Sequence, residues 1–195
     1  MYKRLSAAHF MIRKIFASAL EIIEIAAITI GAVFVIRTYL VQPFLVSGES
    51  MKPTFSDGDY LIIDELSYRF RQPQYADVIV FKYPNDPETY FVKRIIAVPG
   101  ERVKIEDGRV TIYSEKHPDG KVLDEMYLPQ GTTTNRDGQY TVGPGEYFVM
   151  GDNRSYSYDS RSWGMLPQSM IVGLVRIRLW PITHAALFAR HEYAQ

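Results

Sequence analysis

Ser50, a candidate nucleophile, lies among turn-forming residues in the segment Ser47–Thr54, which reads Ser-Gly-Glu-Ser-Met-Lys-Pro-Thr. Gly48 permits close backbone approach or a positive φ, whereas Pro53 fixes its own φ and biases Lys52 toward an extended conformation. Ser50 is therefore expected in a stiff, locally extended turn, which suits a nucleophile that must keep its position. Taken alone, the segment fits a surface loop equally well, because glycine and proline are also common there.

A serine hydroxyl is a poor nucleophile until a base removes its proton. Histidine is the most frequent general base, but none of the four histidines lies on a predicted strand. They are His9, His117, His184 and His191. A Ser-His-Asp triad is therefore not favoured, although it stays open at this point. A lysine of ordinary pKa is neutral in only about one molecule in 2,500 at pH 7, so a lysine base must be buried.

Lys93 has the apolar setting that a neutral lysine requires. It belongs to a predicted strand over residues 90–98, where alternate side chains share a face, so Phe91 and Ile95 flank it on one face. Apolar neighbours disfavour the charged form of an amine and lower its pKa. The alternative is a lysine on an exposed edge strand beside an equally exposed Arg94, since buried lysines are rare.

Lys52 is a competing base, because it follows Ser50 by only two positions. The loop around it is polar and offers no apolar burial that would lower its pKa. The Ser-x-x-Lys arrangement of penicillin-binding proteins is absent, because Pro53 occupies the third position after the serine.

A third polar stretch, residues 151–161, reads Gly-Asp-Asn-Arg-Ser-Tyr-Ser-Tyr-Asp-Ser-Arg. Its Gly-Asp-Asn start predicts a turn. If the remainder is extended, Ser157, Asp159 and Arg161 share one face. Asp159 and Arg161 could then form an ion pair, while the Ser157 hydroxyl could exchange a hydrogen bond with an amine. A solvated, charged loop is the alternative.

Short apolar segments bounded by turn formers predict that residues 41–183 form one β domain. An all-β barrel or sandwich is the fold class that this spacing favours. Asp107 and Gly108, between two of the segments, predict a hairpin. Residues 114–139 are polar and turn-rich, a predicted polar excursion from the core, and residues 184–195 form a C-terminal tail. The predicted strands are Tyr60–Ile63, Val78–Phe81, Tyr90–Val98, Val103–Ile105, Arg109–Tyr113, Glu146–Met150 and Ile171–Leu179.

An apolar segment over residues 22–40 precedes the β domain. As a helix, its 19 residues would span about 28 Å, close to the hydrocarbon thickness of a bilayer. Glu24 and Arg37 lie near its ends, from which charged side chains can reach the interface. We predict a single transmembrane anchor, with a buried core helix as the alternative. Basic side chains in residues 1–21 predict a cytoplasmic N-terminus and an extracytoplasmic β domain at the cell membrane. A cleaved signal peptide fits less well, because no Ala-x-Ala follows the segment.

Composition excludes several classes of function. Lys+Arg and Asp+Glu both number 22, so the chain lacks the basic footprint that a nucleic-acid partner usually leaves. The absence of cysteine excludes thiol catalysis, Cys-ligated zinc and disulfides. The histidines show no metal-ligand spacing either, so we expect neither a metal nor an organic cofactor. The oligomeric state is left open.

The three polar stretches, in this order behind an apolar segment, resemble those of the bacterial type I signal peptidases, or leader peptidases. The matching pieces are Gly48–Thr54, Gly58-Asp59, Asp77–Pro84, Tyr90–Gly100 and Gly151–Arg161. The resemblance covers most of residues 37–180. It implies a membrane-anchored serine endopeptidase that removes signal peptides from exported precursors with a Ser-Lys dyad, through an acyl-enzyme. It also implies the β barrel-sandwich that signal peptidases share with LexA-type proteins, without metal or cofactor.

The resemblance further implies roles for individual residues. Ser50 would be the nucleophile and its backbone N–H an oxyanion donor, Lys93 the general base, and Ser157 the residue that orients the Lys93 amine. Ion pairing would support that loop through Asp159, Arg161 and Arg154. Shallow apolar pockets for small substrate residues at positions −1 and −3 would draw on Phe44, Val46, Met51, Val80, Phe91 and Val92.

One position departs from part of this family. Some members carry a serine two residues before the nucleophile, and its hydroxyl helps to bind the oxyanion, whereas others carry glycine, as here at Gly48. A second oxyanion donor is therefore not assigned. Two other functions stay open, a self-cleaving Ser-Lys protein of the LexA type and a non-catalytic membrane-tethered β domain that binds exported peptides. The expected partners are signal-peptide-bearing precursors and the lipid bilayer.

Overall fold

The structure, a computed structural model, describes residues 14, 18–33 and 42–188. Two compact units divide the chain, Met1–Val41 and Gln42–Gln195. The second unit carries every strand found in the described residues, together with all of the side chains that the sequence selects for chemistry. The fold is therefore mainly β with an N-terminal helix, as the sequence predicts.

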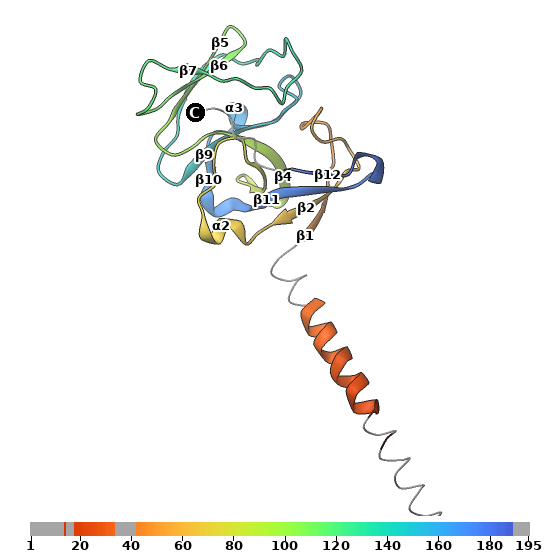
Figure 1. Ribbon diagram of the computed structural model, residues 1–195. Helices are drawn as coiled ribbons and strands as arrows, with labels where there is room; N and C mark the ends of the chain where they lie inside the picture. Colours follow the sequence, from red (N-terminus) through yellow and green to blue (C-terminus); the bar gives the residue numbers. More distant parts are fainter. Residues whose placement is uncertain (1–13, 15–17, 34–41, 189–195) are drawn as a thin grey trace, which may run out of the picture. The chain divides into compact units, whose positions relative to one another are not determined.

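The first unit contains a helix over residues 18–33 (Figure 1). It starts earlier than the predicted anchor 22–40, of which residues 34–40 lie outside the described part of the chain. Large apolar side chains on this helix are exposed, for example Ile22 at 67% and Ile28 at 64%. Within the described residues, no helix combines the length and the apolar character needed to cross a bilayer.

The second unit is built on an eight-stranded antiparallel sheet with the order β1-β2-β11-β3-β4-β9-β10, in which β12 also pairs with β11. The long strand β4 lies between β3 and β9, so it is a central strand rather than an edge. The strands of the eight-stranded sheet are β1 (Gln42–Leu45), β2 (Tyr60–Asp64), β3 (Val78–Tyr83), β4 (Asp86–Ala97), β9 (Glu146–Met150), β10 (Leu166–Pro167), β11 (Ile171–Trp180) and β12 (Ala186–Leu187).

A second sheet of four strands has the order β7-β6-β5-β8. Figure 1 shows its strands β5, β6 and β7 at the end of the domain away from β1 and β2. The predicted hairpin is confirmed, because Asp107 and Gly108 have φ values of 50° and 75°, as a type I′ turn requires. The strands are β5 (Arg102–Glu106), β6 (Arg109–Tyr113), β7 (Lys121–Val122) and β8 (Gly138–Thr141).

Two apolar clusters of the core flank the long strand β4. One contains Val46, Met51 and Val80, and the other contains Phe81 and Ile95. Full burial of an aliphatic or aromatic side chain contributes roughly 1.5–3 kcal/mol to stability. The segment that carries Ser50 is thus anchored in the core through its neighbour Met51, which is 1% exposed.

In the part of the chain that the structure describes, four short helical turns connect the strands, and one of them corrects the sequence interpretation. They are α2 (Ser67–Phe70), α3 (Ser160–Trp163), η1 (Gln168–Met170) and η2 (Ile182–His184). Residues 151–161 are not extended to their end as supposed, because Asp159 is the N-cap of α3 and accepts a hydrogen bond from the Arg161 N–H. The sheet also continues past residue 183, since β12 pairs with β11.

Candidate active site

Ser50 lies in a tight turn between β1 and β2. The Lys52 N–H donates to the Glu49 carbonyl at 3.1 Å, and the Phe55 N–H donates to the Met51 carbonyl at 2.9 Å. Gly48 adopts a φ of 97°, a conformation that costs glycine little. A turn is present, as predicted from the sequence, but these hydrogen bonds make it a tight turn over residues 50–54 rather than a locally extended one.

A second turn, at residues 151–154, holds this serine turn from the other side. The Asn153 N–H donates to the Ser50 carbonyl at 3.0 Å, and Asn153 Nδ2 donates to the Glu49 carbonyl at 3.1 Å. Thr54 Oγ1 donates to a carboxylate oxygen of Asp152 at 2.5 Å. The backbone around the nucleophile candidate is therefore fixed by residues about 100 positions away in the sequence.

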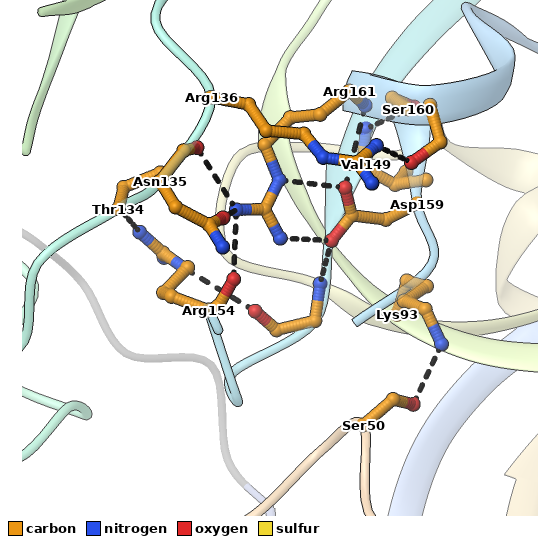
Figure 2. Close-up of polar contacts among 12 residues, drawn as sticks. Ser50, Lys93, Thr134, Asn135, Arg136, Val149, Arg154, Asp159, Ser160 and Arg161 are labelled. Carbon is orange, nitrogen blue, oxygen red and sulfur yellow. Dashed lines mark hydrogen bonds and ion pairs between the residues drawn. The ribbon is translucent and has the colours of Figure 1, made fainter. Parts of the chain in front are cut away.

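Lys93 reaches Ser50 from the central strand β4. Its Nζ lies 2.7 Å from Ser50 Oγ (Figure 2). Nζ also donates a hydrogen bond to the Val92 carbonyl oxygen at 2.9 Å. Nζ also lies 5.1 Å from the centroid of the Phe91 ring. The residue is buried, with 4% exposure, which excludes the exposed edge-strand alternative.

Burial lowers the pKa of Lys93 from 10.5 to about 8, while the carboxylates of Asp159 and Asp152 partly oppose this change. Burial dominates because transfer of an ammonium out of water is costly. With a pKa of about 8, the amine is neutral in about one molecule in ten at pH 7. This neutral fraction is more than a hundredfold larger than that of a free lysine, which is about 1 in 2,500 at pH 7.

Lys52, the competing base, is solvated. Its ammonium forms an ion pair with Glu49 at 2.6 Å, and 44% of the Lys52 side chain is exposed. Of the two lysines that the sequence proposes, the structure brings Lys93 and not Lys52 against the Ser50 hydroxyl.

Ser157 lies beside the serine turn without the expected hydrogen bond. Its Oγ is buried and has no hydrogen-bond partner among the described residues. A Cβ atom added to Gly151 would lie 2.2 Å from Ser157 Oγ and 2.3 Å from the Ser50 carbonyl oxygen. Ser157, Gly151 and Ser50 are thus packed together, and position 151 has no space for a side chain.

Asp159 and Arg161 form the ion pair that the sequence predicts. Arg161 Nε and Nη2 contact the two Asp159 carboxylate oxygens at 2.8 and 2.7 Å (Figure 2). Asp159 also accepts a hydrogen bond from the Gly151 N–H at 3.0 Å. Arg161 Nη1 donates to the Arg154 carbonyl at 2.8 Å. The pair therefore connects both ends of the 151–161 segment.

Arg154 is anchored by a partner that the sequence did not indicate. It is 1% exposed, and its guanidinium pairs with the carboxylate of Glu125, with Nη1 at 2.7 Å from Oε2. Thr134 Oγ1 accepts a second hydrogen bond at 2.9 Å, and the Tyr127 hydroxyl accepts a third at 3.0 Å. All three partners come from the polar excursion, whose spacing of apolar residues gave no signal of this contact.

Arg94 is a residue that sequence reasoning missed. Its Nε and Nη2 contact the two carboxylate oxygens of Asp152 at 2.8 and 2.7 Å, and both side chains are almost fully buried. Strand alternation correctly places Arg94 on the face opposite Lys93, but it does not reveal that this face is covered as well. Because Asp152 belongs to the 151–154 turn, the Arg94 pair ties that turn to β4.

Most of the apolar residues proposed for substrate binding lie together. Val46, Met51 and Val80 belong to one cluster, against which Phe44 and Val92 pack. Phe91 lies in the neighbouring cluster. Among the described residues, no group of three or more Asp, Glu or His side chains could hold a metal ion.

Comparison with known proteins places this arrangement in a family. The model of the family described as "Signal peptidase, peptidase S26" matches residues 19–180. The chain belongs to the signal peptidase family. It is 35% identical to a probable signal peptidase I-1 of Synechocystis over 83% of this chain and 82% of the relative. It is 30% identical to signal peptidase IB of Staphylococcus aureus over 84% of this chain and 91% of the relative.

A signal peptidase I from Enterococcus faecalis is a similar solved structure, at 31% identity, a TM-score of 0.45, and coverage of 53% of this chain and 97% of that chain. Membership in the signal peptidase family decides among the functions that the sequence left open. The protein is a serine endopeptidase that removes signal peptides. Ser50 and Lys93 form a serine–lysine contact in this chain.

Proposed function

We propose that Ser50 is the nucleophile of this signal peptidase and that Lys93 is its general base. The observation that carries the proposal is the 2.7 Å separation of Lys93 Nζ from Ser50 Oγ. An amine in contact with a hydroxyl can remove its proton directly. Burial supplies the neutral amine, because it lowers the Lys93 pKa to about 8.

In the first half of the reaction, neutral Lys93 accepts the Ser50 Oγ proton while Oγ attacks the scissile carbonyl carbon. The carbonyl π electrons move to oxygen, which becomes the oxyanion of a tetrahedral intermediate. The Lys93 ammonium then gives its proton to the leaving nitrogen as the C–N bond breaks. The mature protein departs with a new amino terminus, and the signal peptide stays bound to Ser50 as an ester.

In the second half, Lys93 accepts a proton from water as the water oxygen attacks the ester carbonyl. A second tetrahedral intermediate collapses, and the proton returns to Ser50 Oγ as the ester bond breaks. Lys93 becomes an ammonium transiently in each half, and the carboxylates of Asp152 and Asp159, which favour its charged form, stabilise it. Because these carboxylates partly offset the effect of burial, the pKa of Lys93 stays close to the pH of catalysis, where a general base is most effective.

The Ser50 backbone N–H is the proposed oxyanion donor, because it belongs to the same residue as the attacking oxygen. Gly48 does not provide a side-chain donor, and its own N–H donates to Asp57 Oδ1 at 2.7 Å. The oxyanion site of this chain therefore differs from that of relatives with a serine at this position.

We propose that Ser157 orients the Lys93 amine during the reaction. Its buried Oγ without a hydrogen-bond partner is a group with unused bonding capacity, packed against the turn that carries Ser50. In this role the hydroxyl would accept a hydrogen bond from the ammonium form of Lys93. Asp159, Arg161 and Arg154 hold the backbone of this segment through their ion pairs.

Recognition of the precursor is proposed to use the apolar cluster beside Ser50. Phe44 and Val92 are half-buried and pack against the buried side chains of Met51 and Val80. Phe91 stacks on Tyr83 with a centroid distance of 4.9 Å. A shallow surface of this kind accepts small side chains and excludes large ones by steric clash.

We propose that residues 22–40 anchor the enzyme in the cell membrane, with a cytoplasmic N-terminus and the β domain on the extracytoplasmic side. The exposed apolar side chains of the helix over residues 18–33 support an apolar environment for it. A shared membrane surface would raise the effective concentration of enzyme and precursor. Because the chain has no cysteine, single cysteines placed on either side of the segment would report the topology by their access to an impermeant reagent.

Purified Ser50→Ala and Lys93→Ala variants test the roles directly. Both should fold and should fail to cleave a signal-bearing precursor, whereas Lys52→Ala, which alters the solvated lysine of the same turn, should retain cleavage. Processing of the precursor by either of the first two variants at a rate near wild type would contradict the proposal.

A further inference from the structure

Side chains of the polar excursion, residues 114–139, contact three arginines around the site, which are Arg94, Arg154 and Arg161. Glu125 and Thr134 bind Arg154. Asn135 Oδ1 accepts a hydrogen bond from Arg161 Nη1 at 2.5 Å. These contacts join the edge of the second sheet to the 151–161 segment, and Figure 2 shows Thr134 and Asn135 beside that segment. A segment that reads as a polar loop is therefore part of the support of the active site.

Tyr127 makes the most extensive of these contacts. The centroid of its ring lies 4.0 Å from the Arg94 guanidinium carbon, a short cation–π contact. Its hydroxyl donates to Glu125 Oε1 at 2.6 Å and accepts from Arg154 Nη2 at 3.0 Å. One side chain thus links Arg94, next to the proposed base in the sequence, to Arg154 of the turn that holds Ser50.

Two carboxylates act on the Lys93 amine, and each has an arginine partner. Asp152 and Asp159 both favour the charged amine. Arg94 pairs with Asp152, and Arg161 pairs with Asp159. Each arginine cancels much of the negative charge that would otherwise keep Lys93 protonated. Neutral Lys93 therefore depends on the arginines staying in place and on water staying out.

Tyr127 also forms part of the wall of a small cavity. The cavity has a volume of about 250 Å³, and Thr54, Arg94 and Phe188 are among its other lining residues. A cavity of this size has room for water molecules, and Asp77, Arg94 and Arg176 are polar partners in its otherwise largely apolar lining. Removal of the Tyr127 ring would enlarge the cavity and would expose the Arg94–Asp152 pair to water from the side opposite Lys93.

We propose that Tyr127 is a positioning residue for the reaction, whose ring holds Arg94 on Asp152 and excludes water, so that Lys93 stays neutral at the pH of catalysis. The inference rests on the proposed role of Lys93 as the base. Without the ring, Arg94 neutralises the negative charge of Asp152 less well, and water enters the site. Both changes favour the ammonium form of Lys93. An enzyme without the ring therefore needs a higher pH to reach its full rate.

The test compares full-length Tyr127→Leu and Tyr127→Phe enzymes with wild type. Cleavage of a precursor is followed from pH 6 to 10, and the Lys93 side chain is titrated by NMR in the same range on lysine-labelled protein. Tyr113→Leu is the matched control, because the Tyr113 ring covers the Arg102 guanidinium at a similar 4.2 Å on the second sheet. If the Leu variant does not fold, Tyr127→Met replaces it.

In Tyr127→Leu, we expect the rise of the rate with pH and the Lys93 titration to move upward together, with cleavage reduced about three- to tenfold at pH 7 and little changed at pH 10. Tyr127→Phe keeps the ring and should keep the wild-type profile, as should the control. Equal loss at every pH with an unmoved Lys93 titration, or no change at all, overturns the inference. A moved titration with an unmoved rate profile contradicts the role of Lys93 instead.

Discussion

The amine of Lys93 lies 2.7 Å from the hydroxyl of Ser50, although 43 positions separate the two residues in the sequence. Three features create this contact. The central strand β4 carries Lys93 into the core, Met51 anchors the serine turn in an apolar cluster, and Asn153 fixes the Ser50 carbonyl. Each feature belongs to a different part of the chain, so the contact is a property of the whole domain.

The rate of precursor cleavage should rise with pH through the Lys93 pKa of about 8. Below this value, the neutral fraction of the amine grows about tenfold for each pH unit, so the rate should do the same. Above it, the rate should level off. A profile of kcat/KM between pH 5.5 and 10 measures this, and a midpoint near 6 or near 10.5 would contradict a buried lysine base.

Lys93→Met should change the pH dependence of folding stability. The folded-state pKa of Lys93 lies below its unfolded value. The destabilisation that the buried charge causes is therefore fully present below about pH 8, decreases above it, and disappears as the pH passes 10.5. Lowering the pKa from 10.5 to about 8 corresponds to roughly 3 kcal/mol. The free energy of unfolding of the variant, relative to that of wild type, should therefore decrease by most of this amount as the pH increases from 7 to 10.

Urea unfolding of the two proteins at both pH values measures that difference. Hydrogen bonds lost with the amine affect the variant at each pH, and their contribution largely cancels in the comparison. A difference between variant and wild type that is constant from pH 7 to 10 would show that Lys93 carries no buried charge.

Glu125→Gln should destabilise the domain by roughly 3 kcal/mol, because it leaves the buried charge of Arg154 without its carboxylate partner. The side chains of Arg154 and Glu125 are 0% and 15% exposed. Glu106→Gln provides the control, since its pair with Lys104 lies in solvent at 59% and 37% side-chain exposure. Exposed pairs contribute roughly 0–1 kcal/mol. Denaturant unfolding compares the two variants, and equal losses would contradict the structural role of the polar excursion.

Gly151→Ala should abolish most activity while preserving much of the fold. The added methyl group would approach Ser157 Oγ and the Ser50 carbonyl oxygen to 2.2 and 2.3 Å, so one of these groups must move. Either movement separates the nucleophile from its supports, and misplacement of about 1 Å can cost about 100-fold in rate. Single-turnover cleavage measures the loss. Gly31→Ala controls for loss of a glycine, because no atom lies within 4 Å of the added carbon and the backbone there does not have the positive φ that strains other residues.

Local sequence patterns predicted the central pair of the site and the nearby Asp159–Arg161 ion pair, but not the contacts that cover Arg94 and Arg154. Lys93 was recognisable because Phe91 and Ile95 flank it on one face of a strand. The burial of Arg94 was not, since alternation says which face a side chain occupies and not what covers that face. The cover is Tyr127, which comes from a segment without apolar periodicity.

The fold class and the hairpin at Asp107 and Gly108 also followed from the sequence, because turn chemistry is local. The short helix after Asp159 was missed, although an aspartate ahead of a helical turn is a typical N-cap. The pairing of Arg154 with Glu125 could not be predicted, because ion pairs between distant segments depend on sheet packing. Longer-range contacts of this kind leave no periodic trace in the chain.

The central claim is that an amine at position 93 takes the proton of Ser50. The absence of cysteine from the chain permits its most direct measurement, chemical restoration of the amine. Lys93→Cys should fold and be inactive, and alkylation with bromoethylamine should return precursor cleavage with a pH profile shifted to lower pH, because the sulfur lowers the amine pKa. Cleavage by the Cys variant before alkylation, or none by the folded alkylated protein, would contradict the account.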